Sequence, residues 1–399
     1  MKRFSYRAKD KKTGNIVKGN LQATTERAAG KLLVEQGYVP EKISEVKENF
    51  FSKFANRITT KDRITFSRQF ATLIGAGLPL ANSLRTVAAQ TENKAMKAVI
   101  EDVLNNVEGG KSLTDSFAAH PDVFDNVYIS LVRAGEAGGT LVESLKRLAD
   151  QQEKDAAMMS KIRGAMVYPG IILVVIIAVL AFMMIMVVPQ VRGLYEDMGK
   201  ELPGLTKFLV GMTDFFGMYW WALLIVLGIL VFAFINFRKT DTGRNFFDTF
   251  KLNVPMFKGL FQKLYMSRFA RTMQMLLGAG VSMLDSMAIS ARATGNTVVE
   301  KQVMEAAEKV KAGKELSKSL EDRDYILPLV PQMSSIGEQS GKIDEMLGRA
   351  AKVFTDEVDE QINNISTMIE PILMVIMAGL IGVVIGGTLL PIYSLVSSI

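Results

Sequence analysis

Three long apolar segments without a single charged residue limit this chain to the fold of a membrane protein. They cover residues 170–188, 217–237 and 371–399, and none of them contains Asp, Glu, Lys or Arg. A helix needs about 20 apolar residues to cross the hydrocarbon core of a bilayer. The segments therefore predict three transmembrane helices, and the polar sequence between them predicts domains outside the membrane.

The polar segments repeat once along the chain. The motif Gly-Ala-Gly at residues 75–77 returns at 278–280, and Gly-Glu-Ala-Gly-Gly at 135–139 returns as Gly-Glu-Gln-Ser-Gly at 337–341. An offset of roughly 200 residues that is nearly the same for each motif indicates an internal duplication. Duplication is a common way to build membrane proteins.

These two features predict a mainly α-helical, polytopic membrane protein with two repeated cytosolic helical bundles, three transmembrane helices and a small N-terminal α+β module. The expected segments are the module at 1–50, bundle copy 1 at 58–166, transmembrane helix 1 at 168–190, a short external loop at 191–216, transmembrane helix 2 at 217–237, a cytosolic segment with bundle copy 2 at 238–368, and transmembrane helix 3 at 370–396.

The positions of Lys and Arg predict the orientation in the membrane, because cytosolic segments carry the excess of positive charge. Lys161 and Arg163 precede the first apolar run, and five basic residues follow the second run within residues 238–258. The segment 189–216 holds three basic residues against four acidic ones. We therefore expect a cytosolic N-terminus, two cytosolic bundles and an external C-terminus. No apolar stretch follows the first residues, so no cleavable signal peptide is expected.

Composition argues against an enzyme. The chain has no Cys, which excludes disulfides and thiolate metal sites, and its one His, His120, precedes Pro121 in what reads as a turn. Gly-Lys-Ser at 110–112 lacks the rest of a phosphate-binding loop and is interpreted as a pair of helix caps. The net charge of +6 lies mostly in the first 50 residues, where a solvated cytosolic face is favoured over nucleic-acid binding. We predict no catalytic, cofactor-binding or metal site, and we interpret as solvated the carboxylates at 155, 356, 357, 359 and 360.

The apolar residues of the first copy follow the period of an α-helix. Phe66, Phe70 and Ile74 share one helix face, and Gly-Ala-Gly at 75–77 is placed to end that helix, because Gly adopts the left-handed conformation without a Cβ penalty. A longer helix is expected after the Gly-Glu motif, because Thr140 and Glu143 have the spacing of a capping box. It should run towards the first span as a continuous rod, which could carry motion from the bundle into the membrane.

The N-terminal module has the alternating pattern of strands, for example at Phe4, Tyr6 and Ala8. The expected elements are a hairpin around 12–15, a helix from Thr24 or Thr25 to Gln36, a short strand near Ile43, and an amphipathic linker at 50–57.

Two sets of residues are candidate functional positions. In the paired Gly-Glu turns, we expect the glycines to supply backbone conformations that a Cβ disfavours, and the glutamates to cap a helix or to contact a partner. In the third span, small residues recur every four positions, which allows another helix to approach closely. The candidates are Gly135, Glu136, Gly139, Gly337, Glu338 and Gly341 in the turns, Pro169, Glu370 and Pro371 at the starts of spans, and Ala378, Gly382 and Gly386 in the third span.

The order and spacing of these motifs resemble the type II secretion system F family over essentially the whole chain. The resemblance rests on the first helices of the paired bundles, on the two Gly-Glu turns, and on Tyr-Pro at 168–169 and Glu-Pro at 370–371. Those helices carry Arg-Gln-Phe-Ala-Thr-Leu-Ile-Gly-Ala-Gly-Leu-Pro-Leu at 68–80 and Arg-Thr-Met-Gln-Met-Leu-Leu-Gly-Ala-Gly-Val-Ser-Met at 271–283. Ser282 stands where the family often has Pro, and Ser340 replaces the Gly138 of the first copy.

The resemblance implies a non-enzymatic platform in the cytoplasmic (inner) membrane, beneath a type IV pilus or a type II secretion pseudopilus. Its expected partners are a hexameric assembly ATPase and, in some relatives, a retraction ATPase, together with pilins or pseudopilins, other inner-membrane assembly proteins, lipid and further copies of itself. No cofactor and no nucleic acid are implied. The alternatives are a membrane transporter with an internal repeat, which the absence of ionisable residues from the spans disfavours, and a membrane-anchored signalling adaptor.

Overall fold

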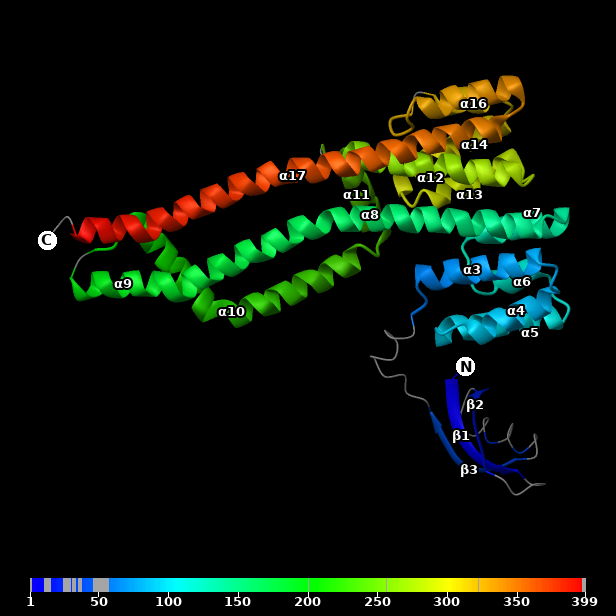
Figure 1. Cartoon of the computed structure of the whole chain (residues 1–399), viewed down its shortest axis with the longest axis horizontal. Coiled ribbons are helices and arrows are strands. Elements are labelled where there is room, and N and C mark those ends of the chain that lie inside the picture. Colours follow the sequence, from blue (N-terminus) through cyan, green and yellow to red (C-terminus); the bar gives the residue numbers. More distant parts are fainter. Residues whose placement is uncertain are drawn as a thin grey trace.

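A computed structural model gives the fold (Figure 1). The long helices α8 (Leu141–Phe182) and α17 (Ile343–Val396) run side by side along the longest axis of the molecule, with the short helices of both copies at one end and α9 (Val188–Asp197) at the other. The C-terminus lies at the same end as α9. The structure describes residues 2–10, 16–23, 30, 34, 38–45, 57–199, 201–255, 257–321 and 323–396.

The N-terminal module contains a three-stranded antiparallel sheet of β1 (Lys2–Asp10), β2 (Ile16–Ala23) and β3 (Tyr38–Glu45). Strand β1 lies between the other two, and Phe4 pairs with Leu21 on one side and Glu45 on the other. The antiparallel pairing of β1 with β2 agrees with the predicted hairpin, whose turn lies outside the described residues, and β3 is the predicted closing strand. The predicted helix over 24–36 and the amphipathic linker fall on residues that lie almost entirely outside the described ones.

The first copy of the repeat is a bundle of five helices followed by one very long helix. Its elements are α3 (Thr60–Gly75), α4 (Leu80–Gln90), α5 (Lys94–Glu108), α6 (Leu113–Ala118), α7 (Asn126–Gly138) and α8 (Leu141–Phe182).

The second copy has the same series of helices in the same order. Its elements are α12 (Lys258–Gly278), α13 (Met283–Ala293), α14 (Thr297–Lys311), α15 (Leu316–Leu320), α16 (Leu329–Ser340) and α17 (Ile343–Val396). Between the copies lie the π-helical turn η1 (Met183–Val187) and the helices α9 (Val188–Asp197), α10 (Gly204–Phe237) and α11 (Asp241–Asn253).

The helix ends follow from the same local chemistry in both copies. Gly77 and Gly280 have φ of +85° and +82°, a conformation that Gly adopts without a Cβ penalty, and they terminate α3 and α12. Asn93 and Asn296 cap α5 and α14 by accepting backbone amide hydrogens. The duplication predicted from the sequence is therefore present in the detail of the caps as well as in the order of helices.

The two bundles pack against each other and do not form two separate domains. The core of copy 1 contains the predicted helix face of Phe66 and Phe70, whose rings stack with centroids 5.5 Å apart, but also Met275 and Leu276 of α12. Farther towards the spans, Met158 of α8 joins residues of α12 and α17 in a third cluster. Apolar burial of this kind is the main force that holds helices together.

Three helical stretches are long and apolar enough to cross a membrane: Leu141–Asp197, Gly204–Phe237 and Ile343–Gly387. Their apolar side chains are largely exposed, as expected of residues that face lipid. Helices α8 and α17 therefore each belong to a bundle at one end and to a span at the other.

Two local expectations differ from the structure. The segment 191–216, predicted to be a short external loop, is helical at 191–197 and 204–216, because polar residues can end an apolar run without ending the helix. Thr140 precedes α8 but its side chain makes no capping hydrogen bond, and Glu143 instead pairs with Arg147 one turn later at 3.1 Å.

Candidate functional site

The paired Gly-Glu turns have the same contacts in both copies. The carboxylate of Glu136 accepts hydrogen bonds from the backbone amides of Leu113 and Thr114 at 3.0 and 3.1 Å, and from the Thr114 hydroxyl at 2.6 Å. These amides belong to the first turn of α6, so Glu136 caps that short helix from a neighbouring helix.

Glu338 does the same for α15. It accepts from the amides of Leu316 and Ser317 at 2.5 and 3.2 Å, and from the Ser317 hydroxyl at 2.6 Å. Of the two roles expected for these glutamates, the structure supports the helix cap.

The hydrogen bonds also change the acidity of Glu136. Partial burial favours the neutral acid, but the bonds from Thr114 and from the amide of Leu113 favour the carboxylate and together outweigh it. The pKa of Glu136 is therefore lowered from its usual 4.5.

The glycines of the turns have two different roles. Gly139 and Gly341 cap α7 and α16 with φ of +70° and +71°, which is the left-handed conformation that we expected. Gly135 and Gly337 are ordinary helical residues, and the expectation of a special backbone is wrong for them. A Cβ at Gly135 would lie 2.6 Å from Oγ of Ser144, and one at Gly337 would lie 2.6 Å from Cα of Ile343. They are small so that the next long helix can approach.

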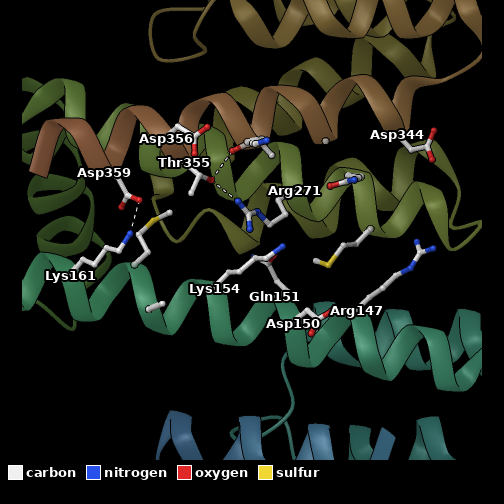
Figure 2. Close-up of a pocket in the computed structure, with 17 residues that line it drawn as sticks. Arg147, Asp150, Gln151, Lys154, Lys161, Arg271, Asp344, Thr355, Asp356 and Asp359 are labelled. Carbon is white, nitrogen blue, oxygen red and sulfur yellow. Dashed lines mark hydrogen bonds and ion pairs between the residues drawn. The ribbon is translucent and has the colours of Figure 1, made fainter. Parts of the chain in front are cut away.

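A cleft of about 710 Å³ opens between α8, α12 and α17, where the two copies meet (Figure 2). Lys161 of α8 pairs with Asp359 of α17 at 2.6 Å across it. Arg271 of α12 donates to the hydroxyl of Thr355 at 2.5 Å. The other charged residues that line it are Arg147, Asp150, Lys154, Asp344, Lys352 and Asp356.

The duplicated sequence is unequal at this cleft. In copy 1, Arg68 pairs with Asp150 at 2.8 Å and with Glu153 at 2.6 Å. Arg271 is the counterpart of Arg68, but the counterparts of those two acids are Lys352 and Thr355. Arg271 instead interacts electrostatically with Asp356 of α17 in its own copy and with Asp155 of α8 in the other copy.

Asp155 is not a solvated carboxylate, which corrects our interpretation of it. It is half-buried on α8, beside a cavity of about 330 Å³ that Arg268 also lines. Burial raises the pKa of Asp155 above its usual 3.8, although Arg268, Gln151 and Arg271 act in the opposite direction. Burial likewise lowers the pKa of Arg271. A charged contact therefore crosses from one copy to the other, and the loss of two acids at aligned positions was the sequence signal for it.

The candidates in the spans are spread along the long helices and do not form one site with the turns. Pro169 lies inside α8, and Glu370 and Pro371 lie inside α17, with Glu370 exposed. A Cβ at Gly382 would meet no atom within 4 Å, and Ala378 is likewise exposed. Within the chain, α10 approaches α17 at the end of the predicted stripe and one position beyond it. Gly386, the last residue of the stripe, is half-buried. The carbonyl of Gly387 accepts a hydrogen bond from the hydroxyl of Thr206 of α10 at 3.1 Å.

Nothing in the described part of the chain resembles a metal centre: no group of three or more His, Asp or Glu is placed to hold an ion there. The Gly-Lys-Ser sequence at 110–112 is a pair of caps as predicted, in which Ser112 accepts from the amide of Asp115 at 3.0 Å.

The fold is that of a duplicated polytopic membrane protein, with two bundles of matching helices and charged contacts between them. The chain belongs to the family described as type II secretion system protein F, whose model matches residues 66–189 and 269–391, once for each copy. The model of the N-terminal domain of that family matches residues 1–44.

Curated relatives are similar over nearly their whole length. The type IV pilus assembly protein PilC of Thermus thermophilus is 34% identical over 404 residues, covering 99% of this chain and 98% of that protein. PilC of Myxococcus xanthus is 35% identical over 399 residues, covering 99% and 95%. The type II secretion system protein F of Vibrio cholerae is 33% identical over 401 residues, covering 98% of both. The resemblance deduced from the sequence is confirmed.

Proposed function

We propose that this chain is a non-enzymatic inner-membrane platform that couples a cytosolic hexameric ATPase to the insertion of pilin or pseudopilin subunits into a filament, and in some systems to their removal. The relatives named above are assembly or secretion proteins, which supports a place in such a machine. The N-terminus and both bundles would face the cytosol and the C-terminus the outside, as the Lys and Arg distribution suggests.

One structural observation carries the proposal: each bundle is joined to a span by an unbroken helix. Helix α8 has 42 residues and α17 has 54. A helix is stiff because each turn is hydrogen-bonded to the next, and Pro169 in α8 and Pro371 in α17 each remove one such bond without ending the helix. A displacement that an ATPase imposes on a bundle would therefore reach the membrane, where a pilin enters the filament.

The turns and the cleft would support this role without chemistry of their own. The capped turns hold α6 and α15 in place, and the ion pair between Lys161 of α8 and Asp359 of α17, with the apolar residues packed beside it, sets the position of one copy against the other. The exposed stripe around Gly382 would receive a pilin helix or a second copy of this chain.

The proposal is tested by breaking one rod while leaving both bundles intact. Gly164 lies in α8 between bundle and span, is exposed, and has open space where a Cβ would be. Gly164→Pro removes a backbone hydrogen bond and breaks or kinks the helix. Gly164→Ala is the matched control, because Ala favours the helix.

We expect Gly164→Pro to abolish filament assembly in the native host, measured by counting filaments, with normal protein level, membrane insertion and co-purification of the ATPase. Gly164→Ala should assemble filaments like the wild type. Normal assembly by the Pro variant would reject the rod as the coupling element. Solute flux into vesicles that contain only this protein would favour a transporter instead.

A further inference from the structure

Helix α11 begins four residues after the span α10 ends, and the bend between them is tight. The Thr240 hydroxyl donates to the carbonyl oxygen of Phe237 at 2.7 Å and accepts from the amide of Gly243 at 3.1 Å. A Cβ at Gly243 would collide with the Phe237 carbonyl. This geometry turns α11 away from the span, so that it lies across the direction of the long helices (Figure 1).

One face of α11 is anchored to the second bundle. Leu252 is fully buried in the core of that bundle. Asp248 accepts from the amide and the hydroxyl of Thr297 at 3.0 and 3.1 Å, and the Asn296 amide donates to the Asp248 carbonyl at 3.1 Å. These contacts fix the rotation of α11 about its own axis.

Because that rotation is fixed, the opposite face is exposed, and it is aromatic. Phe246 and Phe250 are each 58% exposed, and their rings stack with centroids 6.4 Å apart. The aromatic surface continues onto the span, because Phe246 also contacts Phe237, and Phe247 contacts Phe234 and Phe237. Exposed apolar patches of this kind mark interaction surfaces.

Basic residues border the aromatic face. Arg238 and Lys239, between α10 and α11, are exposed, and the Arg238 guanidinium lies 5.9 Å from the ring centroids of both Phe234 and Phe247. Of the two acids of α11, Asp248 is buried and already bonded. An aromatic face flanked by Arg and Lys, at the end of a membrane-spanning helix, is the pattern of a helix that lies in the headgroup layer.

We infer that α11 is an interfacial membrane helix: Phe246 and Phe250 enter the acyl chains beside the end of α10, while Arg238 and Lys239 contact the phosphates of anionic lipid headgroups. The second bundle is thereby held at a fixed height on the membrane surface. The inference concerns the contact of α11 with lipid and does not depend on the coupling role proposed above.

The test uses the full chain, which has no native Cys. Single cysteines at Phe246, Phe250 and Asn245 carry a nitroxide label, and the protein is reconstituted in phosphatidylcholine vesicles with or without phosphatidylglycerol. Electron paramagnetic resonance then compares collisions with oxygen, which concentrates in the bilayer, and with a water-soluble nickel chelate. Asn245 is the matched control because it is exposed and lies about 100° around the helix from Phe246.

Labels at 246 and 250 should collide more with oxygen than with the chelate, and the label at 245 should show the reverse. In vesicles with phosphatidylglycerol, the labels at 246 and 250 should lie deeper in the bilayer than in vesicles without it. Equal depth in both lipids would reject the contact with anionic headgroups. Chelate collisions at 246 and 250 equal to those at 245 would overturn it. Protection of these positions only after a pilin or an ATPase is added would assign the face to a protein partner and would also overturn it.

Discussion

At the scale of single residues, Glu338 shows that the glutamate of a repeated motif can cap a neighbouring helix. Its carboxylate accepts three hydrogen bonds at the start of α15. Glu338→Ala leaves two backbone amides of that turn without this acceptor, so the free energy of unfolding should fall by about 1 kcal/mol, as for the loss of a helix cap. Denaturant unfolding of the purified chain in detergent measures the change.

The same argument for Glu136 predicts a dependence on pH. Since the folded state lowers the pKa of Glu136, its stabilising effect is present above 4.5 and is lost as the pH falls through the lowered value. The difference in stability between the wild type and Glu136→Gln should therefore shrink as the pH falls below 4.5. A glutamate variant with wild-type stability but without filament assembly would show that these carboxylates contact a partner after all.

The left-handed turn glycines should respond to substitution according to backbone strain alone. No atom lies within 4 Å of the position of a Cβ on Gly139, so only its φ of +70° opposes a side chain. Gly139→Val should lower the free energy of unfolding by about 1–2 kcal/mol, the cost of a left-handed β-branched residue, and Gly139→Asn should cost less. Thermal unfolding of both variants gives the comparison, and equal losses would mean that strain is not the cause.

At the scale of helices, the small residues of α17 separate into an inner and an outer face. Gly382 meets nothing in its own chain, whereas a side chain on Gly387 would meet Leu209 of α10. Gly382→Leu should therefore leave the protein level and membrane insertion unchanged and abolish filament assembly. The larger apolar side chain is compatible with lipid but prevents the close approach of a partner helix. Gly387→Leu should instead lower the thermal stability of the isolated chain. Normal filaments from Gly382→Leu would exclude this face from assembly.

The helices also show what could be predicted from the sequence and what could not. The apolar runs and the repeated motifs predicted the spans, the paired bundles and caps such as Gly77, because hydrophobic period and glycine conformation are local properties. The helical structure of α9 and the early start of α10 were missed, because an apolar run marks only the part of a helix that lies inside the bilayer and not the residues where the helix begins and ends. The electrostatic interaction of Asp155 with Arg268 and Arg271 of the other copy was missed, because a repeat in the sequence does not show how the two copies pack.

At the scale of the whole molecule, Asp155, which lies where the two copies meet, makes the stability of the protein depend on pH. The dependence is opposite to that of Glu136, because the pKa of Asp155 is raised and that of Glu136 is lowered. Because burial raises the pKa of Asp155, the folded state holds the proton more tightly than the unfolded state. The wild type should therefore lose stability relative to Asp155→Asn as the pH rises above 3.8. Parallel thermal unfolding of the two proteins over an acidic pH series tests this, and a constant difference would contradict it.

The proposed topology can be checked at the turn between α9 and α10. A reporter inserted within 198–203 should be active outside the cytoplasmic membrane, and one inserted near Lys251 should be active in the cytosol, because Lys and Arg are concentrated on that side. A pair of enzymatic reporters that work on opposite sides provides the measurement. The reverse pattern would place both bundles outside.

The ion pair between Lys161 and Asp359 can be regarded as a fulcrum for α17. At about 1.5 Å per residue, Ile343 lies about 24 Å from Asp359 on the bundle side and Val396 about 56 Å away on the membrane side. With the pair as the pivot, the long arm is about twice the short one. A tilt of α17 about this pivot thus moves the outer end of the span roughly twice as far as the bundle end. Helix α17 therefore has the proportions of a lever that amplifies displacement.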